Sequence, residues 1–364
     1  MNIVHVAESF AGGVFDFLVA LAHGLPEFSH TIIYGKREDT PLSFEERFPR
    51  GTRFYLWQHA AREINPVHDI RALSQIIALL KGMKNADVIH LHSSKAGFLG
   101  RLACRMLGIQ DRVIYSPQGV SFLRKDLSVG KVRLFTYLEI IAARFGGQVI
   151  SSCASEEAAF AEVGITATHI NNGITCEEYF SARPCHTPMV IGTAARITPQ
   201  KNPALFNEIA QAFLPDPSIT FLWMGDGELR HQLSSPNIQI TGWMPKDELT
   251  QKLQHIDVYL STSLWEGLPL SVLLAMCAGK PVVLSDCIGN RDLVENGRNG
   301  FRFVDKDEAI SCIVKLKADA HLVQRMGQSS HELLLDNFHL GTMICQYKEL
   351  YTAVAKADTK GPFK

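Results

Sequence analysis

The sequence predicts two α/β domains, each built on a parallel sheet with helices on both faces. Short apolar runs alternate with helix-period segments along the chain, and this alternation favours parallel sheets that are covered on both sides. The polar, proline-containing stretch 176–188 interrupts the alternation and is expected to be a linker. The length of 364 residues corresponds to roughly two domains of about 150 residues each. The 46% of apolar and 20% of charged residues exclude a disordered or fibrous chain.

Each half supplies its own set of predicted elements. In the first half we expect strands at 3–7, 30–34, 53–56, 87–91, 112–116 and 148–152, and helices through about residue 23 and over 70–81, 97–107 and 131–145. In the second half we expect strands at 189–194, 219–224, 238–241, 258–261, 281–285 and 301–304, and long helices over 318–336 and 341–355. The expected domains are 1–180 and 188–340, with a C-terminal helix over 341–357 that crosses back to the first domain.

Charge and cysteine usage exclude several classes of protein. The 36 Lys and Arg against 37 Asp and Glu leave a net charge of −1, so a nucleic-acid-binding protein is not expected. No two of the eight cysteines form a Cys-x-x-Cys pair, and several lie in apolar runs, as Cys104 and Cys277 do. We expect free thiols in a reducing cytoplasm. The N-terminus does not resemble a signal peptide, and no apolar run is long enough to span a membrane.

The strongest local signal is the segment 261–283. It reads as a strand end, a loop with Glu266 and Gly267, a helix opened by Pro269 and closed by Gly279, and another strand. The amides of a helix N-terminus suit a diphosphate, and Glu266 can accept hydrogen bonds from sugar hydroxyls. Glu266 alternatively serves only as an acid that interacts with the helix dipole, and the spacing alone leaves both interpretations open.

A second signal is the segment 191–203. A predicted strand runs into a loop that carries Arg196 and Lys201, and a helix follows. Two cations at the carboxyl end of a strand suit a phosphate clamp, since arginine binds as a fork and lysine as a point charge. The alternative is a pair of solvated loop cations.

Taken together, these segments resemble the retaining glycosyltransferases of family 4, which have the GT-B fold of two Rossmann-like domains facing a central cleft. The resemblance covers nearly the whole chain. Its further landmarks, specific in their shared order, are Ala11 to Gly13, His90 to Gly97, Tyr115 to Gly119, Asn171 to Ile174, Trp223 to Glu228 and Gly242 to Pro245.

The resemblance implies roles residue by residue. Arg196 and Lys201 match the pair that holds the nucleotide diphosphate, and Glu266 matches the acid that contacts the donor sugar; these three are the expected catalytic residues. The other implied donor-binding residues are Gly12, Gly13, Gly225, Gly267, Leu268, Leu270 and Ser271. Gln118 and Lys95 are the expected acceptor-binding residues, although Lys95 reads equally as a solvated lysine in the first turn of a helix.

Two positions depart from the family pattern. Leu274 stands where the family usually has a second Glu that binds the nucleotide ribose, and its place in the helix predicts a core position. A lost hydrogen bond to a charged group costs about 1.5–3 kcal/mol, so another group holds the ribose or donor binding is weak. Gln118 stands where many relatives have His, and an amide can position a hydroxyl but cannot take a proton.

The mechanism that the family is thought to use needs no general base, because in front-face retention the leaving phosphate accepts the proton of the acceptor. The protein then mainly stabilises charge on the diphosphate. The sequence contains no Asp-x-Asp, and a clamp of amides and cations makes a divalent metal unnecessary. We therefore expect no metal and no further cofactor.

A basic, aromatic-containing region over 120–148 suggests contact with anionic lipid. Its charged residues, a local excess of +3, are Arg124, Lys125, Lys131, Arg133 and Arg144 against Asp126 and Glu139. Arg101 and Arg105, four residues apart on one helix face, are expected to extend this basic surface. The alternative is a core helix with ordinary solvated cations.

The resulting hypothesis is a cytoplasmic retaining glycosyltransferase, peripheral at the inner face of the plasma membrane. It would move a sugar from a UDP-sugar to a glycan acceptor carried on undecaprenyl diphosphate, in the synthesis of a cell-surface polysaccharide such as O-antigen or capsule. One alternative is a transferase with a soluble small acceptor. Another is a catalytically weak subunit that binds sugar nucleotides, which Leu274 and Gln118 motivate. A sugar-nucleotide epimerase shares the architecture, but Arg196, Lys201 and Glu266 favour transfer.

Overall fold

The computed structural model describes residues 1–61, 65–176 and 186–359. Contacts within the chain divide it into two compact units. Unit 1 comprises Met1–Leu123, Ser128–Asn172 and the chain from Leu340 onward, and unit 2 comprises Arg124–Leu127 and Gly173–His339. Most of the expected linker, residues 177–185, lies outside the described residues.

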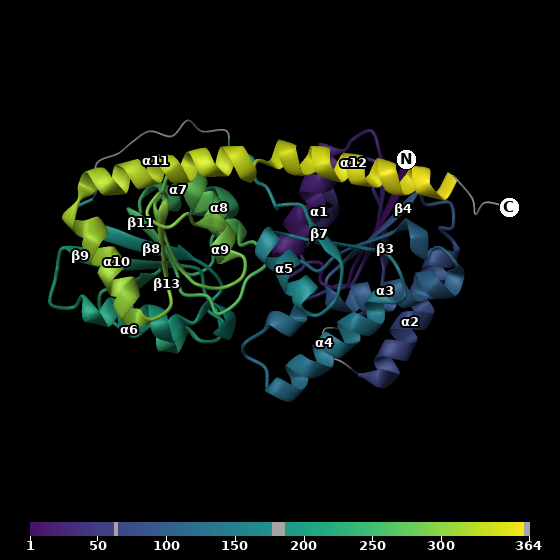
Figure 1. The fold of residues 1–364 in the computed structure, drawn as a ribbon, viewed down its shortest axis with the longest axis horizontal. Coiled ribbons are helices and arrows are strands. Elements are labelled where there is room, and N and C mark those ends of the chain that lie inside the picture. The colour runs from purple at the N-terminus through teal and green to yellow at the C-terminus, as the bar shows by residue number, and fades with distance from the viewer. Residues whose placement is uncertain (62–64, 177–185, 360–364) are drawn as a thin grey trace. The chain divides into compact units, whose positions relative to one another are not determined.

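Unit 1 is built on a parallel sheet of seven strands (Figure 1). The strands are β1 (Asn2–Ala7), β2 (Ser29–Tyr34), β3 (Arg53–Leu56), β4 (Val88–His92), β5 (Val113–Ser116), β6 (Gln148–Ser151) and β7 (Ala167–His169), in the order β3-β2-β1-β4-β5-β6-β7. The six predicted strands are present with ends that differ by at most one residue. Strand β7 was not predicted because its sequence, Ala-Thr-His, contains no apolar run.

In the described part of the chain, six longer helices accompany this sheet. They are α1 (Gly12–Gly24), α2 (Pro66–Lys81), α3 (Ser94–Leu107), α4 (Val129–Ala143), α5 (Ala154–Glu162) and α12 (Leu340–Thr359). Helix α2 begins four residues before its predicted start because the Asn65 side chain accepts hydrogen bonds from the amides of Val67 and His68, and Pro66 suits the first helical position. Helix α12 lies beside α1 (Figure 1) and places Met343, Tyr347 and Tyr351 in the core of unit 1.

A row of buried histidines crosses the core of unit 1. His5 Nε2 and Nδ1 lie 3.2 Å from His30 Nδ1 and from His92 Nε2, and His30 donates to the carbonyl of Leu25. The two ring nitrogens of His90 have different partners. Nδ1 lies 2.7 Å from the hydroxyl of Tyr351 on α12, and Nε2 lies 2.9 Å from the hydroxyl of Ser116. Burial lowers the pKa of His5, His90 and His92 well below 6.5, so these imidazoles are neutral at neutral pH.

The contacts of these imidazoles are those of packed, hydrogen-bonded aromatic rings rather than those of metal ligands. Within the described part of the chain, His5, His90 and His92 form a group whose nitrogens are close enough to share a metal ion. The rings of His5 and His92 are stacked, however, with centroids 5.4 Å apart, and both His90 nitrogens already have hydrogen-bond partners. The arrangement therefore fits a polar layer that joins the sheet to α12.

We expect unit 1 to lose stability in mild acid. The unfolded chain binds protons at these histidines below about pH 6.5, whereas the folded chain does not. The free energy of unfolding should therefore fall with pH below this value, by up to about 1.4 kcal/mol per pH unit for each of the three. Urea unfolding at about pH 7.5 and about pH 5.5 measures this slope.

A matched pair of variants assigns the slope to the buried row. His92→Asn should make the pH dependence shallower, whereas substitution of the exposed His68 should leave it unchanged. A free energy of unfolding that is flat across this pH range would contradict the assignment.

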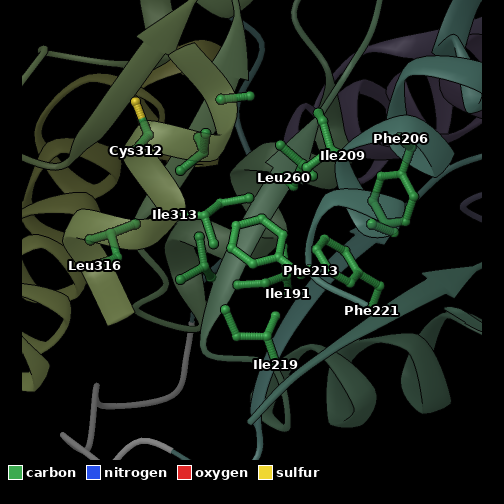
Figure 2. Packing of buried hydrophobic residues seen from close by; sticks show 14 of the residues in the cluster. Ile191, Phe206, Ile209, Phe213, Ile219, Phe221, Leu260, Cys312, Ile313 and Leu316 are labelled. Atoms are coloured by element: carbon green, nitrogen blue, oxygen red, sulfur yellow. The ribbon is translucent and has the colours of Figure 1, made fainter. Parts of the chain in front are cut away.

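Unit 2 is built on a second parallel sheet, of six strands. The strands are β8 (Met189–Ala194), β9 (Ile219–Met224), β10 (Ile238–Ile240), β11 (Val258–Ser261), β12 (Val282–Ser285) and β13 (Gly300–Phe303), in the order β10-β9-β8-β11-β12-β13. The helices are α6 (Pro203–Ala212), α7 (Lys246–Gln254), α8 (Leu270–Cys277), α9 (Asn290–Leu293), α10 (Lys306–Ala318) and α11 (Ala320–Asn337). Side chains from β8, β9, β11, α6 and α10 interlock in the core, among them Ile191, Phe206 and Ile313 (Figure 2).

The expectation that all cysteines are free thiols is wrong for two of them. Cys176 and Cys277, the last residue of α8, form a disulfide, with 5.8 Å between their Cα atoms. The two residues are 101 positions apart in the sequence, so only the fold brings them together. The described free cysteines are Cys104, Cys153, Cys287, Cys312 and Cys345.

Both sheets reverse their strand order at one point. The reversal lies between β1 and β4 in unit 1, and between β8 and β11 in unit 2. Loops that leave two such strands diverge to opposite sides and open a crevice at the carboxyl edge, which is the usual ligand site of open parallel sheets. No described helix has the length and apolarity that crossing a membrane requires.

Candidate active site

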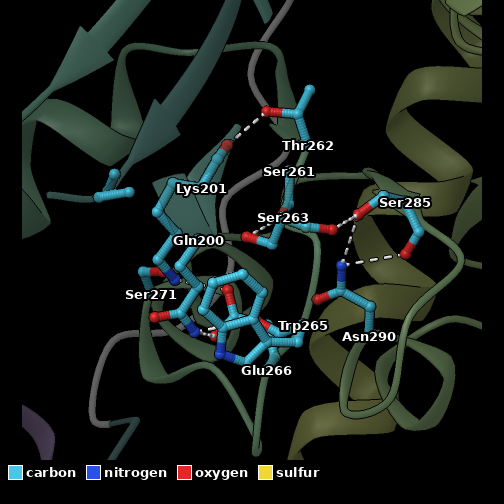
Figure 3. A network of polar contacts seen from close by, with 12 residues as sticks. Gln200, Lys201, Ser261, Thr262, Ser263, Trp265, Glu266, Ser271, Ser285 and Asn290 are labelled. Carbon is cyan, nitrogen blue, oxygen red and sulfur yellow. Dashed lines mark hydrogen bonds and ion pairs between the residues drawn. The ribbon is translucent and has the colours of Figure 1, made fainter. Parts of the chain in front are cut away.

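Lys201 and Glu266 meet at the point of strand reversal in unit 2. Lys201 ends a short 3₁₀ turn (Pro199–Lys201) that follows β8, and Glu266 lies in the loop that follows β11. The Lys201 Nζ lies 2.5 Å from the Glu266 Oε1 (Figure 3). The side chains are 19% and 7% exposed, so this is a largely buried ion pair.

The environment of this pair keeps Lys201 charged. Burial by itself lowers the pKa of the Lys201 ammonium, but the charge and the hydrogen bond of Glu266 raise it by more, and the net pKa is raised. A phosphate that approaches Lys201 therefore meets a cation that already has a carboxylate partner.

Arg196 is the exposed cation of the same edge. It follows the end of β8, and its guanidinium carbon lies 5.6 Å from the ring centre of Trp243, which is itself 65% exposed. The segment 191–203 thus places two cations at this edge, of which Arg196 is exposed and Lys201 is largely buried.

Hydrogen bonds to backbone carbonyls tie the two loops together. The Thr262 hydroxyl donates to the carbonyl of Lys201 at 2.8 Å, and the Leu264 amide donates to the carbonyl of Gln200 at 2.8 Å. Asn202 adopts a left-handed conformation with φ of 49° and caps α6 by accepting from the Leu205 amide. The strained turn and the loop after β11 therefore form one structural block.

The start of α8 is held against β8 by Tyr259. Pro269 is the residue that precedes the helix, which begins at Leu270 and not at the proline as expected. The buried Tyr259 hydroxyl donates to the Ser271 hydroxyl at 3.0 Å and lies 3.3 Å from the amide and carbonyl of Ala194. This contact fixes the first turn of α8, in which the amides of Val272 and Leu273 donate to the carbonyl of Pro269.

Two glycines permit close contacts between loops at this edge. A Cβ on Gly225, whose φ is 140°, would lie 2.1 Å from the carbonyl oxygen of Ala195. A Cβ on Gly289, whose φ is 83°, would lie 1.8 Å from the carbonyl oxygen of Gly267. Gly225 and Gly267 were predicted for the site, whereas Gly289 was missed. The sequence feature that could have indicated Gly289 is its position directly before the short helix α9.

Leu274 does not occupy the predicted core position. Its neighbours Val272, Leu273, Ala275 and Met276 are buried, whereas Leu274 is only half-buried. It follows Leu270 by four residues, so both lie on the less buried face of α8. Where the family usually has a second acid, this helix presents an apolar face. Leu268 is buried, and Leu270 and Ser271 are half-buried.

A network of serines continues the site beyond Glu266. The Ser285 hydroxyl donates to the carbonyl of Ser263 at 2.5 Å, and the Asn290 Nδ2 donates to Ser285. Figure 3 shows these residues together with Glu266 and Trp265. Sequence reasoning missed Gln200 and Asn290; the available signal was that they follow the ends of predicted strands by six and five residues.

The remaining predicted residues lie at the carboxyl edge of the sheet in unit 1. Gly12 and Gly13 begin α1 after β1, and Gln118, with φ of 53°, follows β5. Lys95 is in the first turn of α3 but is not solvated, because it forms an ion pair with Asp69 at 2.7 Å and is 11% exposed. Glu8, which was not predicted, accepts hydrogen bonds from Arg37 and from Ser93 in the same region.

The expected contribution of Arg101 to a basic surface is wrong. Arg101 is buried, pairs with Glu139 of α4, and lies over the ring of Tyr115 with its guanidinium carbon 4.3 Å from the centroid. The four-residue spacing predicted that Arg101 and Arg105 lie on one exposed helix face, but only Arg105 is exposed. Glu139 is likewise buried and pairs with Arg101, so neither residue belongs to the exposed charged surface of α4.

Two parallel-sheet units, with two cations and an acid at a strand reversal, are the arrangement expected of a GT-B glycosyltransferase. Sequence models of two families match: "Glycosyl transferase 4-like domain" over residues 12–172 and "Glycosyl transferases group 1" over residues 188–319. The chain therefore belongs to the GT-B glycosyltransferases of the family 4 kind.

Individual relatives agree with this membership. The chain is 28% identical to the UDP-Gal:alpha-D-GlcNAc-diphosphoundecaprenol alpha-1,3-galactosyltransferase of Escherichia coli, over 86% of this chain and 87% of that one. It is 23% identical to the amylovoran biosynthesis glycosyltransferase AmsK of Erwinia amylovora, over 66% and 64%. Its fold matches that of Anabaena HepE in complex with UDP, with a TM-score of 0.77, 19% identity and coverage of 97% and 100%.

Proposed function

We propose that this glycosyltransferase takes its sugar from a UDP-sugar, retains the anomeric configuration and extends a lipid-linked glycan of a cell-surface polysaccharide, without a metal or other cofactor. The observation that carries the proposal is the placement of Lys201, Glu266 and Arg196 at one strand reversal. The E. coli relative is named for UDP-galactose and a diphosphoundecaprenol acceptor, and HepE was solved with UDP. The E. coli name supports the choice of donor and acceptor, and the HepE complex supports the choice of a uridine nucleotide.

In the proposed reaction the bond between the anomeric carbon and the β-phosphate oxygen breaks, and a bond to the acceptor oxygen forms on the same face of the sugar. The departing phosphate oxygen takes the proton of the acceptor hydroxyl. Negative charge grows on the diphosphate, where Arg196, Lys201 and the first amides of α8 stabilise it. Glu266 accepts hydrogen bonds from hydroxyls of the donor sugar.

Ligand-dependent stability and product analysis test this proposal. UDP and a panel of UDP-sugars should raise the melting temperature, because a ligand that binds only the folded state stabilises it by mass action. The stabilising donor should then transfer its sugar to a polyprenyl-diphosphate-linked N-acetylglucosamine. NMR of the product shows whether the anomeric configuration is retained. Activity after treatment with a chelator shows whether the reaction needs a metal ion. No response to any nucleoside diphosphate would refute the proposal.

The apolar face of α8 favours one competing function. Leu270 and Leu274 cannot accept a hydrogen bond from a ribose hydroxyl, which fits a subunit that binds a sugar nucleotide weakly and does not turn it over. Donor-dependent stabilisation with no transfer to any acceptor, lipid-linked or soluble, is the outcome that would select this function.

We also propose that unit 1 contacts anionic membrane through α4. This helix buries Glu139 and Ala142 but leaves large apolar side chains exposed, namely Val129 at 69%, Leu134 at 48% and Tyr137 at 62%. Lys131 and Arg133 are exposed beside them. Apolar and cationic side chains on one exposed helix suit the interface of an anionic bilayer, and a membrane-bound acceptor would be presented there.

Binding to lipid vesicles should depend on this helix. The wild-type protein should sediment with anionic vesicles at low salt, less with neutral vesicles, and less at high salt. Leu134→Glu should reduce sedimentation severalfold, since it places a negative charge at the surface of the bilayer. Leu335→Glu, at a residue of α11 that is 41% exposed, provides the control and should have little effect. Equal sedimentation of both variants would refute the α4 assignment.

A further inference from the structure

Gln200 joins the two loops of the candidate active site. Its side-chain Nε2 donates to the carbonyl of Trp265 at 2.8 Å and to the Glu266 Oε2 at 3.2 Å (Figure 3). Its own backbone carbonyl accepts from the Leu264 amide at 2.8 Å. The residue directly before Lys201 is therefore fixed to the Glu266 loop through both its main chain and its side chain.

The chemistry of these contacts fixes the orientation of the amide. A carbonyl and a carboxylate are both acceptors, so the NH₂ group of Gln200 has to face them, and its two N–H bonds serve one acceptor each. A flipped amide would place its oxygen against two other oxygens. The assignment of nitrogen and oxygen thus follows from the partners.

The two oxygens of Glu266 have different partners. Oε1 is held by the Lys201 ammonium and Oε2 by the Gln200 amide. Lys201 also belongs to the proposed diphosphate clamp, so it shares its charge with a phosphate when donor binds. The Gln200 amide is neutral, so a phosphate attracts it less strongly than it attracts Lys201.

We propose that Gln200 is a positioning residue, which holds Glu266 in place for the donor sugar while Lys201 engages the diphosphate. This inference rests on the proposed function. A different role is purely structural, in which Gln200 only ties one loop to the other. The two roles differ in how the reaction responds to charge at position 200.

The variant Gln200→Glu distinguishes them, because it is close to isosteric and replaces the donor with a second carboxylate beside Glu266. Two adjacent carboxylates cannot both ionise freely, so the pKa of the pair rises. The proton that this pair takes up goes to the introduced carboxyl, because Glu266 keeps its ion pair with Lys201, and it restores a donor to Glu266. We therefore expect the ratio of kcat/KM at about pH 6 to that at about pH 8 to rise at least about threefold relative to wild type. At the higher pH kcat/KM should be about tenfold lower than in wild type, because the donor to Glu266 is lost.

Two further variants control this result. Gln200→Met removes the donor without adding charge, so kcat/KM should fall with no change in the pH profile. Gln328 donates to Glu332 at 2.9 Å on the exposed surface of α11, so Gln328→Glu makes the same chemical change away from the site. It should leave both the rate and the pH profile unchanged. The acid sensitivity of unit 1 is common to all four proteins and cancels in the comparison.

The outcomes separate the inference from the function it rests on. A wild-type enzyme that transfers sugar while Gln200→Glu keeps the wild-type pH profile would overturn the inference and leave the function standing. A wild-type protein that transfers nothing refutes the function and the inference with it.

If Gln200→Glu fails to fold, Gln200→Met distinguishes the positioning role from the purely structural role. A loss in kcat/KM with unchanged affinity for UDP supports the inference, because UDP lacks the sugar that Glu266 contacts. An equal loss of UDP affinity would overturn it.

Discussion

Turnover should fall about a hundredfold or more when Lys201 or Arg196 is replaced by alanine, because each change removes a preorganised charge from the developing negative charge on the diphosphate. Lys201→Ala should be the more severe, since it also leaves the 7% exposed Glu266 carboxylate without its cation. Steady-state kinetics with saturating donor measure the loss. Near-normal kcat in either variant would contradict the assigned clamp.

Surface ion pairs of unit 2 supply matched controls for this experiment. Lys317 pairs with Asp216 and Arg298 pairs with Glu295, and both pairs are largely solvent-exposed. Alanine at Lys317 or Arg298 removes the same type of cation outside the candidate site. Turnover of these two variants should stay within about twofold of wild type, since exposed pairs contribute little.

Replacing Arg101 with methionine should lower the free energy of unfolding of unit 1 by about 3–5 kcal/mol, because it leaves Glu139 as a buried charge without a partner. The Arg101 Nε also donates to the carbonyl of Gly97 at 2.9 Å, and this bond is lost as well. Urea unfolding measures the change. Arg105→Met, at the exposed residue one turn further on, is the control and should change stability by less than about 0.5 kcal/mol.

A double variant identifies the cause of this loss. Arg101→Met with Glu139→Leu removes both charges, so it should be more stable than Arg101→Met alone. A double variant that is no more stable would mean that packing over Tyr115, and not the unpaired carboxylate, accounts for the loss. An Arg101→Met variant as stable as wild type would contradict the importance of the pair altogether.

The strands could be predicted from the sequence because each buried strand of a parallel sheet is a run of apolar residues. Strands β8, β9 and β11 match their predicted ranges, whereas β7, with no apolar run, was missed. Helix ends were harder, since the early start of α2 depends on the side chain of Asn65. The family motifs located Arg196, Lys201 and Glu266, because short patterns around glycine and proline mark where strands end.

Contacts between distant residues could not be predicted. Gln200 and Glu266 are 66 positions apart, Arg101 and Glu139 are 38 apart, and Cys176 and Cys277 are 101 apart. The periodicity of α3 correctly placed Arg101 one turn before Arg105, but it carries no information on where a buried acid on another helix lies. The same holds for Leu274, whose burial depends on what covers its face of α8 and not on the apolar sequence around it.

The position of α12 has a consequence for the biosynthesis of the protein. The core of unit 1 contains Ile3 and Phe17 from the beginning of the chain and Tyr347, Tyr351 and Val354 from α12. A ribosome makes α12 only after the whole of unit 2, so the first residues of this core remain uncovered until α12 has been made. Unit 2 can finish folding first although its sequence comes second. A truncation that removes α12 should therefore destabilise unit 1, whose other elements precede unit 2 in the sequence.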